Sequence, residues 1–125
     1  MTQAVMPWNV TTVNNYNTLS GPVTLTTDDL LVNQIIYVTD NSNNLITPTA
    51  AQLVAAGQPV VNSCFRFHIT DSGAGGGGGI NLQAGAGVTL LAGGGSSPTF
   101  AAGTTIEVIG RFTNIGAGTE AVILY

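Results

Sequence analysis

The chain of 125 residues is long enough for one domain with a sizeable core, and its charge is very low for that length. Charged residues make up 6%, against about 25% in an average globular protein, whereas hydrophobic residues make up 44%. Its only cations are Arg66 and Arg111 and its net charge is -4, which excludes the basic surface that binding to nucleic acid or to an anionic membrane requires.

The sequence also indicates where the chain is made. Residues 1–7 lack the basic start and apolar middle of a signal peptide, and no apolar run approaches the roughly 20 residues of a membrane helix. Cys64 is the single cysteine, which excludes an internal disulfide. We therefore expect synthesis in a reducing compartment, without membrane passage or insertion.

The first part of the chain predicts an arm followed by strands. Residues 1–20 show no sustained period, so we interpret them as an extended N-terminal arm with at most one edge strand, and residues 21–125 as the folded domain. Residues 23–26 alternate between apolar and polar as a strand does. Residues 31–32 and 35–38 are rich in β-branched and aromatic side chains and predict further strand.

One segment breaks the strand pattern and predicts a helix over residues 47–57. Thr47 is suited to cap the helix, and Pro48 is suited to its first position. Gly57 is suited to the left-handed conformation that ends a helix. We expect this short helix to close an open end of the sheets.

Residues 60–112 carry the clearest architecture. Strict alternation at residues 64–69, and again at residues 80–84 and 105–113, is typical of strands with one buried face. We expect the sheet that contains the first of these strands to pack against a sheet that contains the last. Their core residues are Phe65, Phe67 and Ile69 on one side and Ile106, Val108 and Phe112 on the other.

Turn residues recur about every 8 to 10 residues through the same region. Leu82, Leu90 and Phe100 each stand three residues before a glycine. This rhythm is typical of short antiparallel strands in a sandwich or barrel. Residues 121–125 predict a terminal strand that is apolar on both faces and therefore needs burial on both.

Two motifs could suggest catalysis or nucleotide binding, and both have plainer interpretations. Gly73, Gly75 and Gly78 match a phosphate-loop spacing, yet a strand follows them where such a loop requires a helix N-terminus. Cys64 and His68 stand four residues apart on a strand, about 13 Å, which is too far for a nucleophile and its base. We interpret His68 as structural or interfacial, with a zinc site shared by symmetry copies as the alternative.

Two further motifs are weak. Asp28 and Asp29 could bind calcium, but adjacent carboxylates in a turn usually cap or solvate it. Asn9 begins an Asn-Val-Thr glycosylation acceptor, which we take as coincidence because no signal peptide precedes it. The sequence therefore predicts no catalytic residue, no cofactor site and no metal site.

A resemblance to a known family follows from the order of several segments. These are the Thr-Pro-Thr-Ala-Ala start of the predicted helix, Phe-Arg-Phe-His-Ile at residues 65–69, Leu-Gln-Ala-Gly-Ala-Gly-Val-Thr-Leu at residues 82–90, Phe-Ala-Ala-Gly-Thr-Thr at residues 100–105, Arg-Phe-Thr-Asn at residues 111–114 and Gly-Thr-Glu-Ala-Val-Ile-Leu-Tyr at residues 118–125. Together the chain resembles, over roughly residues 30–125, a head module in surface and fibre proteins of giant DNA viruses, their virophages and some phages.

The resemblance implies a fold and a function. The fold is an all-β, antiparallel jelly-roll β-sandwich with one short helix, similar to the tumour necrosis factor fold and homotrimeric. The function is that of a non-enzymatic structural protein of the virion: a capsid decoration, a fibre head or an attachment module, made in the host cytoplasm. The chain lacks the Gly-X-Y shaft of collagen-like fibre proteins, so a free-standing or capsid-associated trimer is as suitable as an attached fibre.

Composition agrees with assembly from several copies. A monomer with so little charge and a doubly apolar terminal strand would expose a large apolar patch, and such patches normally mark interfaces. The few charges on strand faces suit a subunit boundary, and the resemblance supplies the number three. The expected trimer interface consists of Arg66, His68, Glu107, Arg111, Val122, Leu124 and Tyr125.

Partners other than the chain itself remain open. Capsid proteins and host-surface glycans are the candidates that a virion protein would meet. The main alternative function is a soluble lectin-like carbohydrate-binding module, for which Trp8, Tyr16 and Tyr37 are the candidate contact residues. An enzyme is the third alternative, without residues to support it.

Overall fold

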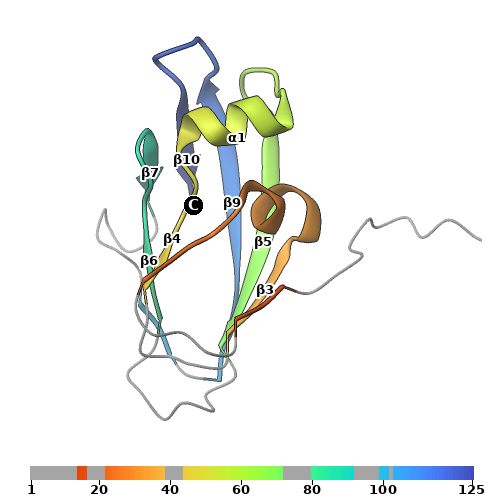
Figure 1. Cartoon of the computed structure of the whole chain (residues 1–125), viewed down its shortest axis with the longest axis vertical. Helices are drawn as coiled ribbons and strands as arrows, with labels where there is room; N and C mark the ends of the chain where they lie inside the picture. Colours follow the sequence, from red (N-terminus) through yellow and green to blue (C-terminus); the bar gives the residue numbers. More distant parts are fainter. Residues whose placement is uncertain (1–13, 17–21, 39–43, 72–79, 92–98, 102) are drawn as a thin grey trace, which may run out of the picture.

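The computed structural model describes residues 14–16, 22–38, 44–71, 80–91, 99–101 and 103–125, and these form two β-sheets around one core (Figure 1). The expected all-β class is confirmed, and two sheets with few helices are compatible with the expected β-sandwich. The six-stranded sheet, in spatial order, contains β1 (Asn14–Tyr16), β3 (Ile35–Val38), β5 (Cys64–Asp71), β9 (Thr105–Asn114), β10 (Ala121–Leu124) and β7 (Val88–Leu90). The four-stranded sheet contains β2 (Val23–Thr24), β4 (Asn44–Ile46), β6 (Ile80–Gln83) and β8 (Thr99–Phe100).

The first six strands wind as a coil. In chain order they alternate between the two sheets, so that β1, β3 and β5 fall in one and β2, β4 and β6 in the other. Each strand pairs in parallel with the next strand of its own sheet. The last strands close the structure, since β9 is antiparallel to β5 and to β10, β8 is antiparallel to β6, and β7 is parallel to β10.

This pairing corrects the expectation of antiparallel strands. Five of the eight strand pairings among the described residues are parallel. A jelly roll is an antiparallel architecture built from two Greek keys, and the coil departs from that pattern. The physical reason is that a turn signal shows where a strand ends and carries no information about the sheet that the next strand joins.

The predicted helix is present, with different ends. Helix α1 spans Ala50–Gly57 and lies across one end of the sheets (Figure 1). Thr49, rather than Thr47, is its N-cap: the Thr49 hydroxyl accepts from the Gln52 amide, and the Gln52 side chain accepts from the Thr49 amide. This reciprocal capping box is readable in the sequence as Thr-x-x-Gln. Gln58, and not Gly57, takes the left-handed conformation after the last turn.

The predicted strand at residues 31–32 is wrong. These residues belong to η1 (Asp29–Asn33), a single wide helical turn that precedes β3. Asp29 begins the turn: its carboxylate accepts from the Thr26 amide at 2.8 Å, and its own amide donates to the Thr26 hydroxyl at 3.2 Å. The turn buries Leu30 completely, so a short apolar run here reflects a buried turn and not a strand.

The core is shared between the two sheets. Its buried apolar residues include Leu45, Leu82 and Ile80 from the smaller sheet. From the larger sheet they include Ile36, Val38, Phe67, Ile69, Val108, Phe112, Val122 and Leu124.

The two core strands were expected in opposite sheets, which is wrong. β5 and β9 are neighbours in one sheet, with Phe67 beside Val108 and Ile69 beside Ile106. The expected inward faces of both strands are nevertheless confirmed, because alternate residues of each are buried. The sheet that packs against them is the one that contains β4 and β6.

Gly110 allows an aromatic cluster to form on this inner face. It stands directly beside Phe65 in the neighbouring strand, and a Cβ atom at this position would collide with the Phe65 ring. The Phe65 ring also lies 5.3 Å from Phe112 and 6.3 Å from Phe67, measured between ring centroids. An aromatic ring laid over a strand glycine fills the space that the glycine leaves empty.

Some expectations concern residues outside the described ranges. They are the glycine run that contains Gly73, Gly75 and Gly78, the acceptor at Asn9, and Trp8. Of the expected N-terminal arm, the described part is β1, which pairs with β3 at the edge of the larger sheet.

Candidate functional site

One side of the six-stranded sheet points away from the core and is here called the outer face. Alternation along each strand assigns residues to it, because their neighbours in sequence are buried. The outer face comprises Ile35 and Tyr37 from β3, Cys64, Arg66, His68 and Thr70 from β5, Thr89 and Leu91 from and after β7, Thr105, Glu107, Ile109 and Arg111 from β9, and Ile123 and Tyr125 from and after β10.

A row of exposed apolar side chains crosses this face. Ile109 and Tyr125 are mutual backbone partners, since each amide donates to the carbonyl of the other. Leu91 donates its amide to the carbonyl of Leu124, which continues the row onto the next strand. The three side chains are 37%, 45% and 48% exposed for Ile109, Tyr125 and Leu91, and they account for half of the six exposed large apolar residues in the described chain.

A charged group lies beside the row. Glu107 Oε2 is 3.2 Å from His68 Nε2 and 3.8 Å from Arg66 Nη1. The side chains remain open to solvent, with exposures of 65% for Arg66, 40% for Glu107 and 38% for His68. Ion pairs this exposed contribute little to folding because water and salt screen them. These charges therefore matter less for the stability of the fold than for the pattern of charge on the outer face.

Arg111 is the second cation of the face and has no carboxylate partner within the described residues. Its guanidinium carbon lies 5.8 Å from the centroid of the Tyr125 ring, a cation–π contact. Its Nε atom is buried and has no hydrogen-bond partner among the described residues. The outer face therefore carries both arginines of the chain, and Arg111 lacks an anionic partner in the part of the chain that the structure describes.

The structure separates the expected interface residues into two groups. Arg66, His68, Glu107, Arg111 and Tyr125 all lie on the outer face. Val122 and Leu124 point the other way and are buried in the core of the protomer itself, so they offer no surface to a partner. The terminal strand is apolar on both faces: Val122 and Leu124 pack in the core, and Tyr125 joins the apolar row on the outer face.

Sequence reasoning missed Ile109 and Leu91 as surface residues. Ile109 stands between Glu107 and Arg111 on the same strand face, so the alternation at residues 105–113 was sufficient to find it. Leu91 could not be found in this way. Its place beside Tyr125 depends on the parallel pairing of β7 with β10, which no local pattern indicates.

The other candidate site residues do not form a centre. Cys64 and His68 are both on the outer face, and the Cys64 thiol contacts the Asn62 carbonyl at 3.7 Å. Asp28 is exposed whereas Asp29 is buried and hydrogen-bonded to Thr26, so the adjacent carboxylates diverge. Within the described residues, no group of three or more His, Cys, Asp or Glu side chains is placed to hold a metal ion.

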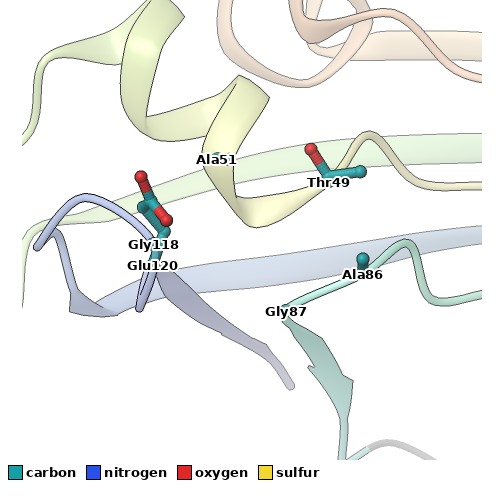
Figure 2. Close-up of a pocket in the computed structure, with 6 residues that line it drawn as sticks. All are labelled: Thr49, Ala51, Ala86, Gly87, Gly118 and Glu120. Carbon is teal, nitrogen blue, oxygen red and sulfur yellow. The ribbon is translucent and has the colours of Figure 1, made fainter.

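A small hollow lies at the end of the sandwich where α1 begins. It is about 370 Å³ in volume and is lined by Thr49, Ala51, Ala86, Gly87, Gly118 and Glu120. Figure 2 shows Glu120 and Thr49 on different sides of the first turn of α1. Glu120 is its one ionisable lining residue, so the hollow does not bring a paired acid and base together. Thr49 already serves as the cap of α1.

The candidate contact residues for carbohydrate are not brought together on the described surface. Tyr37 lies on the outer face beside Thr70, on the far side of β5 and β9 from Tyr125. The backbone of Tyr16 in β1 lies beside that of Val38 in β3. No helix among the described segments is both long and apolar enough to span a bilayer.

The role of the outer face has to be inferred from its own side chains. Tyr125 and Arg111 are of the residue types enriched at protein interfaces, and exposed Ile109 lies beside Tyr125. No family model matches the chain, and no curated protein and no solved structure matches it significantly either.

Proposed function

We propose that this chain is a non-enzymatic structural protein of a virus particle, acting as a self-assembling capsid decoration, fibre head or attachment module. The observation that carries the assembly part is the outer face, where a row of exposed apolar side chains adjoins both arginines of the chain. A sheet face of this kind is suited to cover by another protein. The viral setting rests on the resemblance of residues 30–125 to viral head modules.

The number of copies is part of the proposal. The resemblance implies a homotrimer, and a neutral polar surface with few long charged side chains tolerates close packing of identical copies. The antiparallel jelly roll of the tumour necrosis factor type is the finer fold that the resemblance implies. The proposal does not depend on it, because the parallel coil of β1–β6 departs from that topology.

Two measurements test the proposed function separately. Mass spectrometry of purified virus particles should find the chain at a fixed ratio to the capsid protein, and absence from particles would contradict the virion role. Light scattering of the purified chain should give a mass above that of one 12.7 kDa copy. A stable monomer would contradict the assembly role whatever the particle proteome shows.

The lectin-like alternative predicts a different result. A glycan array should then show binding that is lost on Tyr37→Ala, since Tyr37 is the candidate contact residue on the outer face. Glycan binding by a chain that is absent from particles would favour this alternative.

A further inference from the structure

We propose that the outer face is covered by the outer face of a second copy, related by a two-fold axis that runs across the strands along the row of Ile109, Tyr125 and Leu91. This inference rests on the self-assembly part of the proposed function. It places Tyr125 at a two-fold interface, whereas the sequence-based expectation is the interface of a trimer. An assembly with D3 symmetry has six copies related by one three-fold axis and by two-fold axes. A two-fold contact at the outer face is therefore compatible with trimers that associate in pairs.

The charges on β9 carry the argument for a copy of the same chain. Glu107 and Arg111 stand two residues before and two residues after Ile109 on one strand face. Rotation about an axis through Ile109 across the strands therefore places each Arg111 over the Glu107 of the other copy. The two copies meet with two attractive pairs, one on each side of the axis, which is the self-complementarity that a two-fold interface requires.

Both groups have free bonding capacity for such a pair. Within the described residues, the Glu107 carboxylate uses Oε2 for both His68 and Arg66, and no hydrogen bond or ion pair uses its Oε1. No carboxylate among the described residues lies within ion-pair distance of Arg111, so its charge is available to a partner. Stacked sheets lie about 10 Å apart, a gap that an arginine and a glutamate reaching toward each other can span.

The same axis places the apolar row against itself. Ile109, Tyr125 and Leu91 of one copy then face the same residues of the other, which removes the most exposed apolar part of the outer face from water. Aromatic and arginine side chains at the centre, surrounded by polar groups, match the arrangement of interface hot spots. Thr70 and Thr105 lie at one end of the face, where a neutral polar rim is suitable.

One contact opposes the pairing. Arg66 stands beside Ile109 on the neighbouring strand, so it falls near its own copy across the axis. Its side chain is 65% exposed and its Nη1 lies 3.8 Å from Glu107 Oε2, so the carboxylate offsets part of this repulsion. Arg66→Gln should therefore leave the affinity unchanged or strengthen it.

The test is a charge exchange in the full chain, followed by sedimentation velocity over a concentration series. The wild type should form pairs, or an assembly with an even number of copies. R111E and E107R should each raise the dissociation constant by at least about tenfold, because each variant faces like charges at both positions. An equimolar mixture of R111E and E107R should recover the pair, since every contact across the axis is again attractive.

A second pair of variants keeps the test independent of folding defects. Leu91→Ser removes an apolar contact on the axis, and Val61→Ser is its matched control away from the face, since both side chains are 48% exposed. Leu91→Ser should weaken pairing whereas Val61→Ser should not. Circular dichroism of every variant should match the wild type.

Three results would overturn the inference while leaving self-assembly intact. They are a wild type with three copies only, unchanged assembly of R111E, and a mixture that stays dissociated although both variants fold. A wild type that is monomeric at all concentrations would instead overturn the assembly part of the proposed function as well.

Discussion

The inner and outer faces of the six-stranded sheet are built from the same two central strands and differ in almost every property. On the inner face of β5 and β9, Phe67 and Val108 are buried side by side and Phe65 covers Gly110. On the outer face, the residues that alternate with them are Arg66, Glu107 and Ile109, all exposed. The same two strands therefore present a buried face and an exposed face, and adjacent residues of each strand belong to opposite faces.

The comparison shows how this chain reconciles low charge with a defined structure. The core is formed by close packing of apolar side chains, including aromatic rings that cover Gly110. The outer face has few charged side chains, and they lie next to the row of exposed apolar residues. Changes on the inner face should therefore act on folding. Changes on the outer face should act on association and leave folding nearly unaffected.

The largest effect on folding is expected for Phe67→Ala. Phe67 is fully buried and stacks with Phe65, so truncation should leave a cavity and lower the free energy of unfolding by about 3 to 5 kcal/mol. Urea unfolding followed by circular dichroism would measure this. The matched control is Arg66→Ala on the adjacent outer position. If both variants unfold at the same urea concentration, the distinction between the faces is incorrect.

A smaller effect is expected for Gly110→Ala. The added methyl group would meet the Phe65 ring, and overpacking of this kind costs about 1 to 3 kcal/mol. Combining it with Phe65→Ala makes room for the methyl group, so the double variant should be more stable than the sum of the single changes predicts. Strict additivity in thermal unfolding would show that ring and glycine do not share this space.

The smallest effect on folding is expected for Glu107→Gln. Its partners Arg66 and His68 are both well exposed, and surface ion pairs contribute about 0 to 1 kcal/mol. The unfolding free energy should change by less than about 1 kcal/mol, while association measured by sedimentation should weaken. A loss of folding stability comparable to that of Phe67→Ala would assign Glu107 to the fold and not to the surface.

Local patterns were sufficient for much of the structure. Alternation identified β5 and β9 and the buried side of each, and the residues of β3 and β10 were also indicated. The helix was found, although its capping box at Thr49 and Gln52 was overlooked. The polar members of the outer face followed from the same alternation, because the side-chain period of a strand is fixed by its backbone.

The sequence by itself determined which residues alternate, where one helix forms and how little charge the surface can carry. Only the tertiary structure decided that β1–β6 wind as a parallel coil, that β5 and β9 lie in one sheet, and that Leu91 extends the row of Ile109 and Tyr125. The physical reason is that side-chain direction is a local property of each strand. Strand partners are instead selected by burial and hydrogen bonding between segments that are distant in the chain, which no local pattern records.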